Sequence, residues 1–258
     1  MTVQRPPRPK FDVLTLAAAP VAWLAYRWGR VVGAYSRMAF DPATQPVVGL
    51  EHLPDEPRIF ATWHGQGLLS LRGHSAFSRP SPALLSRGYT LRRGRAFVPK
   101  GIRGVAMRGW IHGAGCRAVT TVLDENAAAG ALKEMVRYLQ SGEDALVAVD
   151  GPVGPAFRVR PGALFLSRLS GCPIVPTGMA ARPAVHYPRW DRLLVPFPRA
   201  AIATVVGEPL SVGRRDDLGD DLMQELGRRI DAATAQAWSV VNAPGELTPT
   251  DDVEASRV

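Results

Sequence analysis

Residues 145–155 read ALVAVDGPVGP, an apolar run that ends abruptly in a carboxylate and paired Gly-Pro turns. The run from Ala145 to Val149 has the length of a strand and carries no polar side chain. The Gly-Pro pairs fix a rigid turn that presents Asp150 and leaves backbone amides free. We therefore predict a strand that delivers a carboxylate to its end, where α/β folds place their sites.

Similar apolar runs recur on either side of this stretch, with helical patterns between them. The strand-like runs are Arg58–Trp63, Ile174–Met179 and Ala201–Val206, and the helical patterns span about 101–114, 126–141, 161–170 and 216–238. Such alternation is typical of a largely parallel sheet covered by helices. The sequence therefore predicts an α/β fold, with a mainly parallel sheet flanked by helices, over residues 41–241. Residues 1–10 and 242–258 are predicted to be disordered.

An apolar segment at residues 11–40 precedes this domain and predicts a helix. Val13 to Tyr26 is uncharged, but roughly 14 such residues fall short of the ~20 that span a bilayer. Three interpretations stand open: a cleaved signal peptide, a buried core helix, and an amphipathic helix at a membrane surface. We favour the third, because Trp23 and Trp28 lie beside arginines suited to lipid head groups.

The chain has a formal net charge of +8, and its basic residues are almost all arginine. The guanidinium fork matches phosphate and carboxylate, which favours an acidic partner such as an anionic membrane surface or a phosphorylated substrate. No motif of a nucleic-acid-binding module is present, so we expect no nucleic-acid partner. Cys116 and Cys172 are too few for a disulfide framework or a zinc site, and reduced thiols fit a cytoplasmic protein.

A histidine follows another predicted strand, in the segment Trp63-His64-Gly65-Gln66. An imidazole at a strand end is suited to project into a cleft and take a proton from a hydroxyl. A structural histidine, hydrogen-bonded near the strand end, is the alternative. Arg158 and Arg160 follow Asp150 closely and are suited to hold a phosphate or a carboxylate, or else they are simply solvated.

The order of the motifs along the chain carries more information than any one of them. VGLEHLP at 48–54 precedes WHGQ at 63–66, and further on come DGPVGP at 150–155, PGALFLSRLSGCPIVPTG at 161–178, RWD at 189–191 and GEP at 207–209. This series resembles the lysophospholipid acyltransferase superfamily, most closely its bacterial DUF374 branch, over roughly residues 20–212. DGPVGP and the sequence that follows it are the most specific parts of the resemblance.

The resemblance implies an acyl transfer in which a histidine removes the proton of an acceptor hydroxyl, which then attacks an acyl thioester. His64 would be that base, and Asp150 would orient it or the acceptor. The donor, acyl-CoA or acyl carrier protein, is a co-substrate, so no metal or bound organic cofactor is expected. The arginines near Asp150 would hold a phosphate, and the glycines of both motifs would allow close backbone approach. The expected substrate-binding residues are Trp63, Gly65, Gln66, Gly151, Pro152, Arg158 and Arg160.

Departures from the family pattern fall at two places. The wider superfamily has an H-x-x-x-x-D motif whose acid orients the imidazole, but this chain has Leu69 at that position, and the DUF374 branch also lacks the acid. Another acid, such as Asp150, is therefore expected to reach His64. Residues 86–130 also lack the Ser-rich and Arg-Gly-Ser-Ser pattern of that branch, which leaves the acceptor open.

Together these features predict a membrane-associated acyltransferase on the cytoplasmic face of the cell membrane, with a lipid hydroxyl as acceptor. A non-catalytic membrane- or lipid-binding member of the same fold is the alternative, because of Leu69 and the altered region 86–130. A serine hydrolase is a further alternative, since Gly73-His74-Ser75 resembles the start of a nucleophile elbow. However, Phe77 stands where G-x-S-x-G needs its second glycine.

Overall fold

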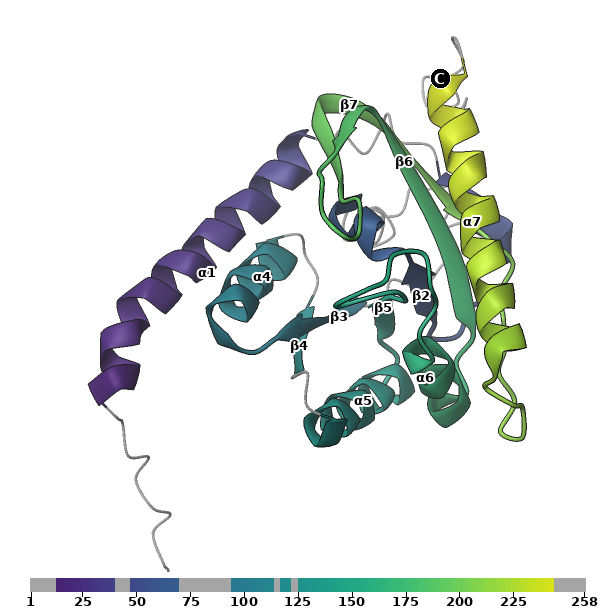
Figure 1. The fold of residues 1–258 in the computed structure, drawn as a ribbon, viewed down its shortest axis with the longest axis horizontal. Helices are drawn as coiled ribbons and strands as arrows, with labels where there is room; N and C mark the ends of the chain where they lie inside the picture. Colours follow the sequence, from purple (N-terminus) through teal and green to yellow (C-terminus); the bar gives the residue numbers. More distant parts are fainter. Residues whose placement is uncertain (1–12, 40–46, 70–93, 114–116, 122–124, 244–258) are drawn as a thin grey trace, which may run out of the picture.

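The computed structural model describes residues 13–39, 47–69, 94–113, 117–121 and 125–243 (Figure 1). The strands are β1 (Val47–Val48), β2 (Ile59–Thr62), β3 (Gly94–Pro99), β4 (Arg117–Thr121), β5 (Asp144–Ala148), β6 (Ile174–His186) and β7 (Leu194–Val206). They form a seven-stranded sheet in the order β1-β7-β6-β2-β5-β3-β4. Neighbouring strands run parallel, except that β6 and β7 form an antiparallel hairpin.

Helices flank this sheet, as the sequence predicts. They are α1 (Val13–Ala39), α4 (Gly101–Gly113), α5 (Glu125–Gln140), α6 (Gly162–Ser170) and α7 (Asp220–Asn242), with short 3-10 helices η2 (Leu50–His52) and η3 (His64–Gln66). The α/β class and the mainly parallel sheet are therefore confirmed. The ends predicted to be disordered are 1–10 and 242–258. Asn242 is instead the last residue of α7, and residues 1–10 and 244–258 lie outside the described residues.

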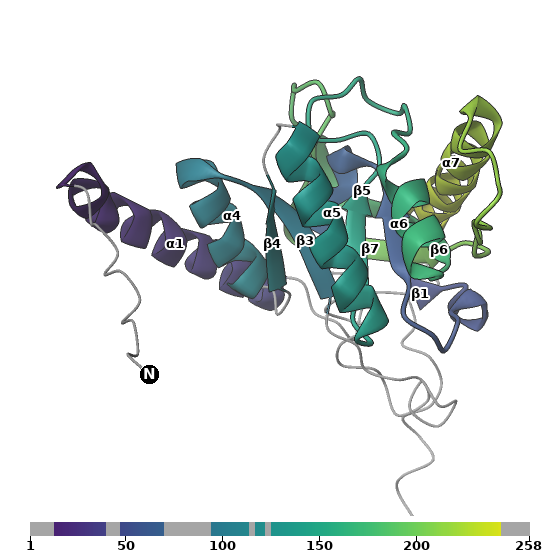
Figure 2. The ribbon, with the colours of Figure 1, turned by 90° about the horizontal axis from the view of Figure 1, so that it is seen from below.

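The core lies on both faces of the sheet, because buried side chains alternate along β2. Ile59 and Ala61 join a cluster with residues of α5, α6 and the first half of α7, while Phe60 faces a cluster that includes Ile111 of α4. Figure 2 shows α5 and α6 side by side over one face of the sheet. Since successive residues of a strand point to opposite faces, an all-apolar strand is buried on both.

The N-terminal helix α1 packs along α4 through glycines whose backbones nearly touch the facing helix. A Cβ atom added at Gly29 would lie 2.1 Å from the Ala106 carbonyl oxygen, and one at Gly33 would lie 2.5 Å from that of Trp110. Small residues allow helix backbones to approach this closely. The facing glycines of α4 are Gly109 and Gly113. In the part of the chain that the structure describes, no helix is both long and apolar enough to cross a membrane.

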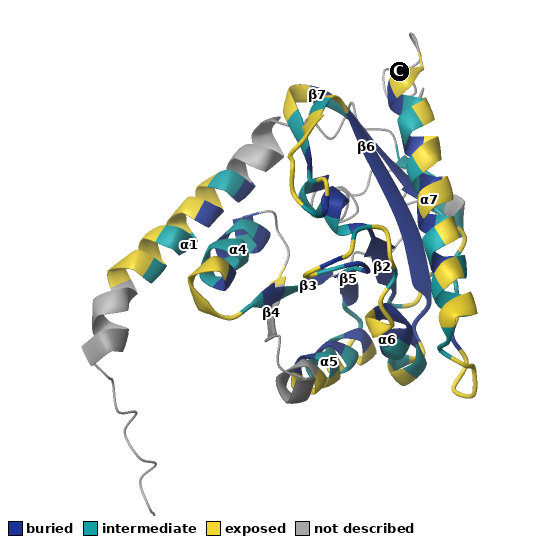
Figure 3. Cartoon of the chain, in the orientation of Figure 1, coloured by how far each residue is buried: buried dark blue, intermediate teal, exposed yellow. Residues whose placement is uncertain are grey.

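Another side of α1 is exposed to solvent (Figure 3) and carries several large apolar side chains. Its large exposed side chains are Val21, Trp23, Leu24, Trp28 and Val31, with exposed fractions between 57% and 69%. The segment predicted as helical at 11–40 is thus helical from Val13 to Ala39. It is packed against the domain on one side and uncovered on another.

Candidate active site

The candidate site lies where the segments that follow three neighbouring parallel strands meet. Strand β2 leads into His64, β5 leads into Asp150, and β6 leads into a turn at residues 187–193 that contains Asp191. Because the carboxyl ends of parallel strands lie at the same edge of a sheet, residues far apart in sequence converge here.

An ion-pair-like contact between His64 and Asp191 forms the centre of the site. Nδ1 of His64 lies 2.7 Å from Oδ2 of Asp191. The Asp191 side chain is fully buried, whereas the His64 side chain is 27% exposed. A carboxylate only accepts hydrogen bonds, so Nδ1 carries the hydrogen that it donates to Asp191, and Nε2 is the ring nitrogen left for another partner. Among the described residues, no protein atom hydrogen-bonds to Nε2. This arrangement suits a general base.

Asp150 lies beside His64, but its carboxylate holds the backbone and not the imidazole. Its Oδ1 accepts the backbone N–H of His64 at 2.7 Å, and its Oδ2 accepts the backbone N–H of Phe157 at 3.0 Å. Asp150 is 1% exposed, so it does not face a substrate. The expectation that Asp150 orients the imidazole is therefore corrected: Asp191 takes that position, and Asp150 ties the segment after β2 to the segment after β5.

Glycines allow these segments to pack closely around the imidazole. A Cβ atom added at Gly151 would lie 2.6 Å from Cδ2 of His64, and one at Gly65 would lie 2.2 Å from the backbone oxygen of Asp191. The close backbone approach predicted for Gly65 and Gly151 is thus present, and the partners are protein atoms.

Two residues of the turn after β6 complete the surroundings of His64, although they were not predicted as site residues. The Trp190 ring centroid lies 5.0 Å from that of His64, and the same ring covers Gly154. Arg189 places Nη2 3.3 Å from Oδ2 of Asp191, and its side chain is 38% exposed. The only sequence signal for this turn is the RWD motif at 189–191 in the family resemblance.

The polar groups of Trp63 and Gln66, both predicted to bind substrate, are occupied by protein partners. The buried Trp63 donates its indole N–H to Oδ1 of Asp231 at 2.8 Å. The Gln66 side chain accepts from Thr62 Oγ1 and from the Met179 backbone N–H, and donates to Thr234 Oγ1. These side chains therefore anchor the His64 segment to β6 and α7.

The remaining predicted residues lie in the loop between β5 and α6. Arg160 donates from Nη2 to the carbonyl oxygen of Gly154, so part of its guanidinium supports the loop. Arg158, Arg160 and Pro152 are all exposed, so only the bond from Arg160 to Gly154 distinguishes the two arginines. Of the two arginines, Arg158 therefore has the freer side chain for a ligand.

Leu69, which stands where the wider superfamily has its acid, is a core residue. It is 1% exposed and packs with Met179 and Leu194. A carboxylate could not replace it without being buried in apolar surroundings. Ser75 of the hydrolase alternative lies outside the described residues, as do residues 86–93 of the divergent region.

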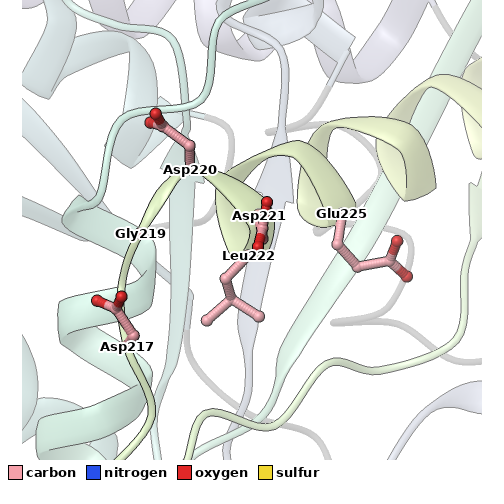
Figure 4. A pocket seen from close by; sticks show the side chains of 6 residues that line it. All are labelled: Asp217, Gly219, Asp220, Asp221, Leu222 and Glu225. Carbon is pink, nitrogen blue, oxygen red and sulfur yellow. The ribbon is translucent and has the colours of Figure 1, made fainter.

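One hollow in the described part of the chain lies apart from the site around His64. A hollow at the start of α7 is lined by Asp217, Gly219, Asp220, Asp221, Leu222 and Glu225, and it shares no residue with the site around His64 (Figure 4). Its acidic lining would repel a phosphate. Within the described ranges, no group of three or more His, Cys, Asp or Glu side chains is placed to hold a metal ion.

Comparisons with known proteins give one relative without an assigned function. No protein-family model matches the chain, and no solved structure matches it significantly. A protein of Rickettsia prowazekii (strain Madrid E), which carries the name uncharacterized protein, is 26% identical over 160 residues. The match covers 62% of this chain and 66% of that protein, just under two thirds of its length. These comparisons assign no chemistry to the site around His64.

Proposed function

We propose that this protein is a membrane-associated acyltransferase that moves an acyl chain from a thioester donor to a lipid hydroxyl. The observation that carries the proposal is the pair of a partly exposed His64 and a buried Asp191, 2.7 Å apart at the carboxyl edge of the sheet. An imidazole held by a buried carboxylate, with its other nitrogen open, is the arrangement that activates a hydroxyl group.

In the proposed reaction, Nε2 of His64 accepts the proton of the acceptor hydroxyl while the hydroxyl oxygen attacks the thioester carbonyl carbon. The Asp191 carboxylate stabilises the imidazolium that forms and keeps the ring in place. The carbon–sulfur bond then breaks, the thiolate leaves, and the imidazolium returns its proton to the thiolate. The products are an ester and a free thiol. The donor would be acyl-CoA or acyl carrier protein, and the chemistry needs no metal.

Asp191 can supply the orienting carboxylate that the Leu69 position lacks. In the wider superfamily, the orienting acid lies five residues after the histidine, whereas here it would be supplied from the turn after β6. Asp191 is the only residue of the RWD motif that bonds the imidazole, and Arg189 of that motif bonds Asp191 in turn. On this proposal, the acyltransferase-like fold is retained and the acid has moved to another segment.

Exposed cations beside the dyad favour an anionic group on the acceptor or the donor. Arg189 approaches Asp191 from the exposed side, and Arg158 is exposed in the neighbouring loop. Guanidinium groups bind phosphate through paired N–H donors. We therefore assign the phosphate of a lysophospholipid, or of the donor, to Arg189 and Arg158 in preference to Arg160.

The exposed side of α1 supports attachment to a membrane surface, which in this proposal is the cytoplasmic face. Val21, Leu24, Trp28 and Val31 recur at helical spacing and are all exposed. Arg27, which stacks over the Trp23 ring at 5.5 Å, adds a cation suited to anionic head groups. An apolar stripe beside arginines is typical of a helix that lies in the interface of a bilayer.

The proposal is tested by incubating the purified chain with acyl-CoA or acyl carrier protein and a panel of lysophospholipids, and by identifying products by mass spectrometry. Transfer is expected with the unmodified chain and not with His64→Ala of unchanged circular dichroism. His52→Ala, which removes a histidine outside the site, is expected to keep the activity. Absence of transfer with every pair, together with retained vesicle binding, would instead favour a non-catalytic lipid-binding protein.

A further inference from the structure

The hairpin of β6 and β7 carries a face on which several large apolar side chains are exposed. In its outer part, Val185 pairs with Val195 and His186 pairs with Leu194, and the Tyr187 backbone N–H bonds to the Leu193 oxygen at 2.8 Å. Because side chains alternate along a strand and paired residues share a side, this register divides the hairpin into two faces.

One of these faces packs on the domain. Leu194 is 3% exposed and belongs to a core cluster with Leu69, and the His186 ring lies 6.3 Å from that of Trp238 on α7. This side of the hairpin is therefore the inner face. Leu194 is covered by the domain on this side, although the His186 side chain remains exposed.

The opposite side is the outer face, formed by Val185, Tyr187, Leu193, Val195 and Phe197. Val185 is 47% exposed, Tyr187 is 55% exposed and Phe197 is 47% exposed. An antiparallel pair that covers a core on one side normally presents polar residues to water on the other. Contiguous exposed apolar side chains on a soluble surface mark an interaction site.

The charges around the outer face identify the kind of partner. Arginines lie at the turn and at the base of the hairpin, and the only acid in residues 182–199 is the buried Asp191. The exposed arginines are Arg182, Arg189, Arg192 and Arg199. Arg182 bonds Asn242 of α7 and Arg189 bonds Asp191, so Arg192 and Arg199 are the cations that we assign to the partner. Apolar and aromatic side chains with neighbouring arginines match an anionic lipid surface, where the apolar groups enter the interface and the arginines meet head groups. An acidic soluble protein would pair with the arginines, but it would offer no apolar surface to the side chains of the outer face.

The outer face adjoins the candidate site directly. The turn of the hairpin carries Asp191, and Trp190 packs on Gly154 of the loop between β5 and α6. That loop exposes Val153 by 62% and Phe157 by 52%. Phe157 has a φ of 60°, a conformation that bulky residues rarely adopt, and its N–H is held by Asp150. Phe157 therefore has a strained backbone conformation, and its ring is half exposed beside the site.

We infer that the outer face of the hairpin rests on an anionic lipid surface, together with Val153 and Phe157, and so opens the His64 site toward lipid. This inference rests on the proposed function for its purpose, since it explains how a lipid hydroxyl reaches Nε2. It adds a second membrane contact to that of α1 and places it at the site itself.

Fluorescence of a label on the hairpin tests the inference without reference to activity. In a Cys116→Ser, Cys172→Ala background of the full chain, Tyr187→Cys carries an environment-sensitive dye, and Arg214→Cys, on another exposed segment, serves as the control. Vesicles of phosphatidylcholine and phosphatidylglycerol in equal parts are expected to raise the emission at position 187 about twofold or more, with a blue shift, and to leave position 214 unchanged.

A Leu24→Cys label on α1 reports whether the chain binds the vesicles at all. No change at position 187 while the α1 label responds would overturn the inference, because the chain would then bind by α1 alone. A response at position 187 to acyl carrier protein and not to vesicles would also overturn it, in favour of a protein-docking surface. Absence of acyl transfer would count against the proposed function and would leave these results standing.

Charge variants give a second, independent measurement. Arg192→Gln with Arg199→Gln is expected to weaken sedimentation with the anionic vesicles by about tenfold or more. Arg214→Gln with Arg215→Gln removes the same charge from another exposed segment and is expected to have a much smaller effect. Equal losses for the two pairs would show that only net charge matters and would contradict a specific role of the hairpin.

Discussion

Asp191 places its carboxylate 2.7 Å from Nδ1 of His64, although 127 residues separate the two along the chain. The contact exists because β6 lies next to β2 and runs parallel to it, so that the turn after β6 reaches the segment after β2. The buried acid fixes the hydrogen on Nδ1 and leaves Nε2 available at the surface of the site. The proposed chemistry depends on this pair.

Asp191→Asn is expected to lower kcat for acyl transfer by about 100- to 10,000-fold, because an amide can donate to Nδ1 and stabilise the wrong tautomer. Initial rates at saturating donor would measure the loss. Asp231→Asn is the matched control: its side-chain oxygen can still accept from the Trp63 indole, so the rate should stay within about twofold. Similar losses in both variants would argue against a special role for Asp191.

Gly151→Ala is expected to lower kcat by about tenfold to 100-fold with little change in thermal stability. The new Cβ atom would lie 2.6 Å from Cδ2 of His64 and would displace the ring, and small displacements of a catalytic group are costly. Gly67→Ala places the same methyl group near the site with nothing within 4 Å of it, so its activity should be retained. Full activity of Gly151→Ala would contradict the assigned position of the imidazole.

The strands that carry the site could be predicted from the sequence, whereas the edge of the sheet could not. The all-apolar run Ala145–Val149 contains most of β5 (Asp144–Ala148), but β3 and β4 read GRAFVP and RAVTT, whose polar residues hide the strand pattern. The strand predicted at Ile174–Met179 continues to His186 in the structure. Its second half has no apolar pattern that would predict a strand, and it is held in place by pairing with β7.

The identity of the orienting acid was the main error at the site. Asp150 and Asp191 both follow strands that neighbour β2, but this strand order is known only from the fold, and Asp150 alone was named from the sequence. Asp150 is turned to the backbone N–H groups of His64 and Phe157, which only the fold of the loop determines. The prediction of His64 at an accessible strand end needed no such detail and agrees with its partial exposure.

Gly33→Ala is expected to lower the free energy of unfolding in urea by about 1–3 kcal/mol, since the added methyl group forces tightly packed helices apart. Its Cβ atom would lie 2.5 Å from the Trp110 carbonyl oxygen and 2.8 Å from Cα of Gly113. Gly130→Ala, in α5 with open space around it, should instead raise stability by up to about 1 kcal/mol. If both substitutions stabilise the protein, α1 does not pack on α4 as described.

The pKa of His112 is lowered from its ordinary value of 6.5 by burial and by the nearby cations Arg108, Arg30 and Arg117. Below about pH 6.5 this histidine is protonated in the unfolded chain but not yet in the folded protein. The free energy of unfolding therefore falls as the pH decreases from about 6.5 toward the lower pKa of the folded state. Tyr26 of α1 bonds Nδ1 of this ring at 3.1 Å.

His112→Gln is expected to lose less stability than the unmodified protein between pH 7.5 and pH 5.5, because glutamine does not titrate. Urea unfolding at the two pH values measures the difference, and contributions from the other histidines cancel in the comparison. An equal loss in the two proteins would mean that His112 is as easily protonated in the fold as in the unfolded chain.

The most direct test of the central claim is a double-mutant cycle of acyl transfer with His64→Ala, Asp191→Asn and the two combined. If the imidazole is the base and the buried carboxylate acts through it, the combined variant should be no slower than His64→Ala, because Asp191 has nothing left to orient. Losses that multiply in the combined variant, or full activity of His64→Ala, would show that these residues do not act as one unit and would contradict the account.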